Sequence, residues 1–206
     1  MVEHVATRIF LASRNAKKLA EMQRILGEAM PDVTVVGLDD VTGYAEPVED
    51  QPDFDGNALL KARAGYRATG LPTVADDSGL CVDALNGMPG VLSARWSGSH
   101  GDDEANLRLL LAQLADVPAG ERGARFVCVA ALVLPSGPEH LAEGEVLGQL
   151  TRAPRGSNGF GYDPIFVPGG FELTTAQMSA DEKDKISHRG KALRALAPVI
   201  AKALGG

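Results

Sequence analysis

Two long stretches in the second half of the chain place the tightest limit on its fold. Arg125–Leu134 and Leu141–Leu150 both read as β-strands, and the turn-forming residues Pro135-Ser136-Gly137-Pro138 separate them. A strand–turn–strand pattern of this kind predicts an antiparallel pair. Any sheet that includes these two strands therefore contains antiparallel neighbours.

The rest of the chain alternates short apolar strands with helical segments. Apolar residues recur on one face of the segment 15–30, which indicates a helix that Pro31 ends. We expect further helices over 57–69, 102–115 and 187–204, and short strands over 8–12, 33–36, 73–75, 80–84 and 165–167. This alternation predicts an α/β fold with a mixed sheet. No long linker divides the 206 residues, so we expect a single domain over residues 1–206.

The negative charge of the chain is concentrated in one segment. The formal net charge is −7, and the stretch from Asp39 to Asp55 holds seven acids but no Lys, Arg or His. Outside this stretch the acids balance the 20 bases. The acidic balance argues against a general nucleic-acid binder. The segment is either a solvated acidic loop or a place where one or two carboxylates hold a cation.

The sequence gives no sign of a membrane segment or a secretion signal. The long apolar run that includes Val127–Leu134 is far shorter than the roughly 20 residues of a membrane helix. The N-terminus does not fit a signal peptide. Cys81 and Cys128 lie in apolar surroundings without metal-ligand spacing, which favours reduced thiols and a cytoplasmic location.

The segment Leu11–Lys18 runs from a predicted strand into the start of a helix. Free backbone N–H groups and the helix dipole make such a junction attractive to phosphate, and Lys18 adds a positive charge. The alternative is that Ser13 only caps the helix and Lys17 pairs with Glu21.

Two adjacent carboxylates follow the strand predicted over 73–75. Asp76 and Asp77 are costly side by side unless a cation or a proton separates them, and magnesium prefers oxygen ligands. Asp77 is therefore a candidate for holding Mg²⁺ or for orienting a metal-bound water. The alternative is an Asx-type turn, which Asp-Ser-Gly commonly forms.

Two later segments combine features of a ligand site. Glycines surround two aromatic residues in Gly156–Pro164, which suits close approach to a ligand and stacking on a base. The alternative is a flexible loop whose aromatics cover the core. Residues 181–190 place three donors beside a helix start, and the alternative there is a solvated charged turn. These donors are Lys183, His188 and Arg189.

The order and spacing of these segments resemble those of one family. The motifs are Ser-x-Asn-x-x-Lys, Phe-x-Gly-Asn-Ala-x-x-Lys-Ala, Ala-Asp-Asp-Ser-Gly-Leu, Ser-Ala-Arg-Trp-Ser-Gly, Gly-Phe-Gly-Tyr-Asp-Pro and Ser-His-Arg-Gly. From about Ile9 to about Leu196 the chain resembles the inosine/xanthosine triphosphate pyrophosphatase family. The resemblance implies a homodimer and a two-lobed α/β fold: a long mixed β-sheet with helices on its faces and a cleft between the lobes. It also implies Mg²⁺-dependent hydrolysis of non-standard purine nucleoside triphosphates (ITP, dITP and XTP) to the monophosphate and pyrophosphate.

The same resemblance implies roles for individual residues. The triphosphate-binding positions are Ser13, Asn15 and Lys18, with Ser78 as a further substrate contact. The metal positions are Glu49 and Asp77, and Asp77 is also the catalytic acid/base. The base-binding loop is Phe160, Gly161, Tyr162 and Asp163, and the remaining nucleotide contacts are Lys183, His188 and Arg189. A buried donor, Arg189 or Lys183, would pair with the 6-oxo group of hypoxanthine or xanthine and oppose the amino group of adenine.

Two positions depart from the family pattern. Arg14 stands where many relatives have Gly, and Gly56 stands where some carry an acid.

Two other functions share some of these features. A pyrophosphatase for pyrimidine or modified nucleotides would use the same chemistry, but the Ser-His-Arg and Phe-Gly-Tyr-Asp segments argue against it. A non-catalytic nucleotide sensor need not keep both Glu49 and Asp77, as this chain does.

Overall fold

The computed structural model describes residues 7–13, 16–135 and 137–204. These residues form a six-stranded sheet in the order β2-β1-β3-β4-β5-β6. The strands are β1 (Thr7–Leu11), β2 (Val33–Val36), β3 (Thr73–Val82), β4 (Gly123–Val133), β5 (His140–Leu150) and β6 (Phe166–Pro168). β1 is parallel to both β2 and β3, whereas β5 and β6 are antiparallel. The α/β class and the mixed sheet are therefore confirmed.

Five α-helices lie within the described ranges. They are α1 (Ala16–Ala29), α2 (Phe54–Thr69), α3 (Asp103–Gln113), α4 (Ala180–Ile186) and α5 (His188–Leu204). Short 3-10 helices cover Leu38–Asp40, Asp83–Leu85, Gly90–Arg95, Ala119–Glu121, Asp163–Ile165 and Thr175–Gln177. The chain divides into two compact units. Unit 1 comprises Met1–Asp77, Cys128–Gly144 and Arg189–Gly206, and unit 2 comprises Ser78–Val127 and Glu145–His188.

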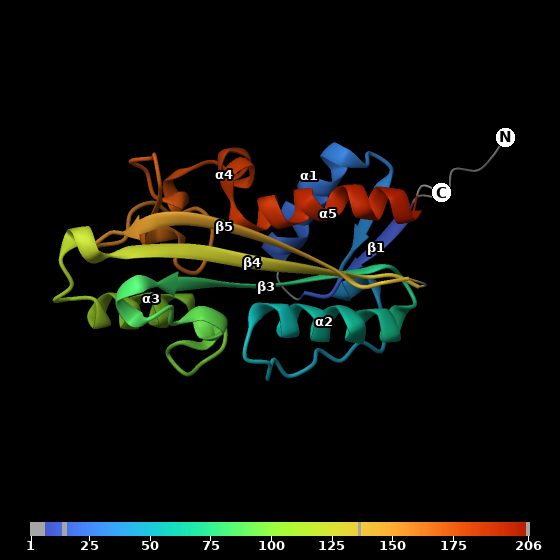
Figure 1. Cartoon of the computed structure of the whole chain (residues 1–206), viewed down its shortest axis with the longest axis horizontal. Helices are drawn as coiled ribbons and strands as arrows, with labels where there is room; N and C mark the ends of the chain where they lie inside the picture. The colour runs from blue at the N-terminus through green and yellow to red at the C-terminus, as the bar shows by residue number, and fades with distance from the viewer. Residues whose placement is uncertain (1–6, 14–15, 136, 205–206) are drawn as a thin grey trace. The chain divides into compact units, whose positions relative to one another are not determined.

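Unit 1 buries both faces of its part of the sheet. Helices α1 and α5 cover one face and α2 covers the other (Figure 1). Because successive strand residues point to opposite faces, neighbours in sequence enter different cores. Val74 of β3 packs with α1 and α5, and Ala75 packs with Ala58 and Ala62 of α2.

Unit 2 has its own apolar core, built around the other ends of the long strands. Helix α3 contributes Leu107, Leu110 and Leu114. These side chains pack in one cluster with Phe126 of β4 and Phe166 of β6. The two aromatic rings meet edge to face, with centroids 4.6 Å apart. The loop that carries Tyr162 also enters this core, so the core supports the predicted base-binding segment.

The structure corrects two local expectations and adds one helix. Residues 73–82 form one continuous strand, so the expected turn at 76–79 is absent; a Cβ at Gly79 would lie 2.2 Å from Gly90 O, and only glycine allows this approach. Helix α2 begins at Phe54 rather than Asn57, because Asp53 caps it by accepting a hydrogen bond from Gly56 N. Helix α4 lies where the alternative for residues 181–190 was a solvated charged turn, and Ser179 and Glu182 cap its start.

Smaller expectations hold. Gly70 ends α2 in the left-handed conformation, with φ 67°. Cys81 and Cys128 are buried and form no disulfide within the described residues. Across the described parts of the chain, no helix has the length and apolar character needed to cross a membrane.

Candidate active site

The two adjacent carboxylates of β3 point to opposite faces of the sheet in unit 1. Asp76 faces the α1 and α5 side, where Lys18 and Arg189 donate to it. Asp77 faces the α2 side, where Asn57 and Lys61 donate to it. Each buried carboxylate therefore has its own set of partners.

Lys61 holds Asp77 and Glu49 together. Its Nζ lies 2.6 Å from Glu49 Oε1 and 3.4 Å from Asp77 Oδ1. Burial and the charge of Glu49 raise the pKa of Asp77 above its ordinary value, against the opposing effects of Lys61 and Asn57. Although burial lowers the pKa of Lys61, the carboxylates of Asp77, Glu49 and Asp76 raise it overall, so its ammonium stays charged.

Asn57 is fully buried, and its amide is fixed by the backbone of Gln51. Its Oδ1 accepts from Gln51 N at 3.1 Å and its Nδ2 donates to Gln51 O at 3.4 Å. This pairing aims Nδ2 at Asp77 Oδ2, 3.1 Å away. A Cβ at Gly56 would lie 2.7 Å from Gln51 Cβ, so glycine permits the close approach of Gln51 to the start of α2. Asn57 therefore ties the segment that carries Glu49 to Asp77.

On the opposite face, Asp76 lies among cations. Lys18 Nζ is 2.9 Å from Asp76 Oδ2, and Arg189 Nε is 3.2 Å from the same oxygen. Arg189 Nη1 also donates to Glu21 at 2.6 Å. Although burial raises the pKa of Asp76, Lys18, Arg189 and Lys61 hold it well below its ordinary value. Asp76 is therefore an ionised anchor for Lys18 and Arg189.

The acids of the segment Asp39–Asp55 have separate partners. Asp40 Oδ2 accepts from Gly37 N, Asp53 caps α2, and Asp50 accepts from the Gln51 side chain. Glu49 alone of these four turns to a buried cation, Lys61. Three of the seven acids therefore accept local hydrogen bonds, and a fourth, Glu49, pairs with a buried cation.

Glu49 and Asp77 fit a hard divalent cation. Their carboxylates both contact the Lys61 ammonium, which brings these two oxygen donors close together. Magnesium takes one or two protein carboxylates and completes its shell with water and phosphate oxygens. Within the described ranges, no group of three or more His, Cys, Asp and Glu side chains could hold a metal, so a site here depends on non-protein ligands.

In unit 2, Asp163 is the centre of the predicted base-binding loop. Its Oδ2 accepts from Lys183 Nζ at 2.6 Å and from Phe160 N at 2.8 Å, and its Oδ1 accepts from Thr175 Oγ1 at 2.8 Å. The Lys183 ammonium also lies 5.0 Å from the centroid of the Phe160 ring. The nearly buried Asp163 thus orients both an aromatic face and a cation.

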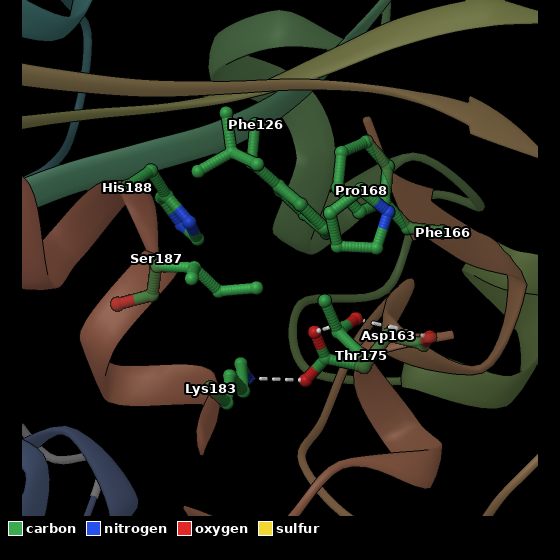
Figure 2. Close-up of a pocket in the computed structure, with 10 residues that line it drawn as sticks. Phe126, Asp163, Phe166, Pro168, Thr175, Lys183, Ser187 and His188 are labelled. Carbon is green, nitrogen blue, oxygen red and sulfur yellow. Dashed lines mark hydrogen bonds and ion pairs between the residues drawn. The ribbon is translucent and has the colours of Figure 1, made fainter. Parts of the chain in front are cut away.

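A small pocket in unit 2 joins this cluster to His188. Figure 2 shows Asp163, Thr175 and Lys183 on one wall and Phe126 and His188 on another. The imidazole of His188 stacks on the Phe126 ring, with centroids 4.8 Å apart and 10° between the planes. An aromatic surface and a cation therefore lie around one small pocket.

Tyr162 and Gly161 fasten the same loop. The Tyr162 hydroxyl donates to Ser93 O at 2.9 Å, and Asp103 Oδ2 accepts from Gly161 N at 2.8 Å. Burial, with a smaller effect of Asp103, raises the pKa of Tyr162. Tyr162 is thus a neutral, buried support for the loop.

The structure groups most of the predicted site residues within three clusters. In unit 1, Lys18 and Arg189 meet at Asp76 on one face of the sheet, and Glu49 and Asp77 meet at Lys61 on the other. The third cluster lies in unit 2 and comprises Phe160, Gly161, Tyr162, Asp163, Lys183 and His188. Ser13 lies two residues after the end of β1, Ser78 follows Asp77 within β3, and Asn15 lies outside the described residues.

Sequence reasoning missed Glu21, Asn57, Lys61, Asp76 and Thr175 as members of these clusters. Asn57 and Lys61 stand four residues apart in the motif Phe-x-Gly-Asn-Ala-x-x-Lys-Ala. Residues at this spacing share one face of a helix, so the motif held a signal for both. Asp76 was considered only as a neighbour of Asp77. The partners of Glu21 and Thr175 lie far along the chain or in another loop, and no local pattern marks them.

Comparison with known proteins gives one consistent result. The Ham1 family model matches residues 9–199. A dITP/XTP pyrophosphatase of Nocardia farcinica is 62% identical over 94% of this chain and 95% of its own length. A dITP/XTP pyrophosphatase of Corynebacterium efficiens is 58% identical over 96% of this chain and 99% of its own length.

Solved structures agree with this result. A nucleoside-triphosphatase (dITP/XTP pyrophosphatase) from Mycobacterium abscessus is 57% identical, with a TM-score of 0.74 over 94% of this chain and all of that chain. A HAM1 protein from Coxiella burnetii is 39% identical, with a TM-score of 0.84 over 96% of this chain and all of its own.

Proposed function

The chain belongs to the Ham1 family, and we propose that it hydrolyses the non-standard purine nucleoside triphosphates ITP, dITP and XTP to the monophosphate and pyrophosphate. The convergence of the Glu49 and Asp77 carboxylates on one buried cation carries this proposal. Relatives that are 62% and 58% identical over nearly the whole chain bear the name dITP/XTP pyrophosphatase. Hydrolysis of such triphosphates removes deaminated purines from the nucleotide pool.

Magnesium is the cofactor that this donor set supports best. Glu49 and Asp77 would hold it, and the ion would offset phosphate charge and make a bound water more acidic. Lys61 keeps a further positive charge beside these carboxylates. On the other face of the sheet, ionised Asp76 orients the Lys18 ammonium. In this proposal Ser13, Asn15 and Lys18 bind the triphosphate and Ser78 contacts the substrate.

Asp77 is suited to accept a proton from water. Its pKa lies above the ordinary value of an aspartate, so it is a stronger base than a solvent-exposed carboxylate. The water oxygen forms a bond to the α-phosphorus as the bond from the α-phosphorus to the bridging oxygen breaks. Pyrophosphate leaves, and Lys18 stabilises the charge that develops on it. Positioning and charge stabilisation dominate such phosphoryl chemistry.

The unit 2 cluster suits a 6-oxopurine. An ammonium has only donors, so Lys183 pairs with the 6-oxo group of hypoxanthine or xanthine and opposes the amino group of adenine. Phe160 and His188 offer ring faces to the base. Two donors of Arg189 are engaged by Asp76 and Glu21, so we assign base reading to Lys183 rather than to Arg189.

A screen of nucleoside triphosphates with detection of both products tests this function. With ITP and Mg²⁺ we expect IMP and pyrophosphate, and much slower turnover of ATP, GTP and pyrimidine triphosphates. Release of IDP and orthophosphate would overturn the proposed cleavage. Tight binding of ITP without turnover would identify a nucleotide sensor instead.

The remaining organisation is also proposed. Each unit combines stretches that are separate in sequence, which supports one domain over residues 1–206. The resemblance supports a homodimer that acts on a small-molecule substrate and binds neither nucleic acid nor membrane. Buried cysteines without a disulfide support a location in the cytoplasm. Light scattering of the purified chain tests the dimer and should give twice the mass of the chain.

A further inference from the structure

The carboxylate of Asp163 is held by three donors that come from three different segments. Lys183 of α4 and the backbone of Phe160 share Oδ2, at 2.6 and 2.8 Å. Thr175 Oγ1 lies 2.8 Å from Oδ1 and 3.1 Å from the main-chain oxygen of Asp163. The Thr175 hydroxyl has a single proton and therefore donates it to Oδ1, the nearer of the two oxygens. Thr175 is the donor that Oδ1 receives in this cluster.

Thr175 is firmly held beneath this loop. It opens the 3-10 helix Thr175–Gln177, and Asn158 N donates to the carbonyl of the next residue, Ala176, at 3.0 Å. A Cβ at Gly156 would lie 2.4 Å from the same carbonyl oxygen. The hydroxyl of Thr175 thus projects from a closely packed support and not from a free loop.

The position of the Asp163 carboxylate sets the position of the Lys183 ammonium. A carboxylate can turn about its terminal torsion, because that torsion is broad. Donation by Thr175 to Oδ1 fixes the plane of the carboxylate and leaves Oδ2 facing Lys183 (Figure 2). The same oxygen accepts from Phe160 N. Without the hydroxyl, Oδ1 would be a buried oxygen lacking this donor, and rotation of the carboxylate would draw Lys183 away.

We propose that Thr175 is a positioning residue for base selection: through Asp163 it holds the Lys183 ammonium where it discriminates a 6-oxo from a 6-amino purine. This proposal rests on the proposed function of the chain. Thr175 itself contacts neither base nor phosphate in the proposal. Its effect therefore falls on the preference for ITP over ATP and on KM, and not on the cleavage step.

The chain offers a matched control at the adjacent position. Thr174 is 0% exposed and Thr175 is 5% exposed. Thr174 Oγ1 donates to Arg155 O at 2.7 Å, a main-chain oxygen outside the Asp163 cluster. Thr174→Val and Thr175→Val therefore delete the same group at similar burial, but only the second removes a donor from Asp163.

The experiment compares wild type, Thr175→Val, Thr175→Ser and Thr174→Val with ITP and ATP, and measures melting temperatures and IMP affinity by calorimetry. For Thr175→Val we expect the ITP:ATP ratio of kcat/KM to fall by roughly ten-fold, the size of one hydrogen bond to a charged group. The change should lie in KM for ITP and in a matching loss of IMP affinity, with kcat for ITP within about two-fold. Thr175→Ser should keep the ratio, and Thr174→Val should lower the melting temperature without changing the ratio.

Two results would overturn the role of Thr175. The first is that Thr175→Val loses ITP and ATP turnover equally. The second is that Thr174→Val lowers the ITP:ATP ratio of kcat/KM as much as Thr175→Val does. If Thr175→Val does not fold, Thr175→Ala removes the same donor, and its ITP:ATP ratio of kcat/KM tests the proposal in the same way. A wild-type chain that releases no pyrophosphate from ITP would instead refute the proposed function itself, so the two failures are distinguishable.

Discussion

Lys61 Nζ lies 3.4 Å from Asp77 Oδ1, and both groups are buried on the α2 face of β3. The same ammonium is 2.6 Å from Glu49. The two carboxylates that would hold a divalent ion are thus kept close together, in the absence of that ion, by a positive charge of the protein. This arrangement preorganises acidic ligands that would otherwise repel each other.

Replacing Lys61 should uncover that repulsion. We expect Lys61→Met to lower the free energy of unfolding by about 3–5 kcal/mol, because it leaves buried carboxylates without their cation. Mg²⁺ should restore more stability to this variant than to wild type, since only a bound ion can then offset Glu49 and Asp77. Urea unfolding with and without Mg²⁺ measures both effects.

Arg63→Met is the matched control on the same helix. Arg63 pairs with Glu139 at the surface, and such exposed pairs contribute about 1 kcal/mol or less. An equal loss of stability in the two variants would contradict the role given to Lys61.

Asp77→Asn should separate turnover from binding. The amide keeps the size of the side chain but cannot accept a proton from water, so kcat for ITP should fall by about 10²–10⁴-fold. Nucleotide affinity in calorimetry should stay measurable, because Lys18 and the unit 2 cluster are untouched. Turnover at the wild-type rate would rule out Asp77 as the base.

The pH dependence of stability should carry opposite contributions from the two aspartates. The pKa of Asp76 is held well below its ordinary 3.8, so its contribution is present above that value and is lost as pH falls through the depressed pKa. The pKa of Asp77 is raised, so Asp77 favours the folded state at low pH, and this contribution is lost as pH rises through the raised pKa.

Asp76→Asn tests the contribution of Asp76 to the pH dependence of stability in metal-free protein. The stability gap to wild type should be largest above about pH 4 and should shrink toward lower pH. Urea unfolding at a series of pH values measures the gap. A gap that stays constant with pH would mean that the charge of Asp76 does not stabilise the fold.

Arg189→Ala should act on stability more than on base choice. Arg189 is buried and donates to both Asp76 and Glu21, so its removal leaves two buried carboxylates short of a partner and should cost about 3–5 kcal/mol. At a temperature where the variant is folded, its ITP:ATP ratio should match that of wild type. A collapse of that ratio would return Arg189 to the reading of the base, a role that the sequence left open between Arg189 and Lys183.

The sequence predicted the elements whose signals are local. Apolar periodicity located α1 and the strands, and glycine marked the end of α2. It failed at β3, because Asp-Asp-Ser-Gly has the composition of a turn while tertiary contacts with Gly90 and Ser93 make it a strand. It also failed at α4, a short charged helix without an apolar stripe.

For the site, the motifs located the segments but not the pairs that form between them. Lys61 takes its partners from the acidic segment and from β3, and Arg189 takes its partners from β3 and α1. Such pairings depend on how strands and helices pack, and no spacing along the chain encodes them.

The continuity of β3 through Asp76 and Asp77 has a consequence for how the gene can change. Because side chains alternate along a strand, gain or loss of a single codon upstream in β3 would exchange the faces of the two aspartates and separate each from its own partners. Substitutions in this strand can be gradual, but a one-residue change in its length cannot. Related chains should therefore carry no insertion or deletion between Thr73 and Asp77. A scanning library of single-codon deletions should show a sharp loss of function across the same residues.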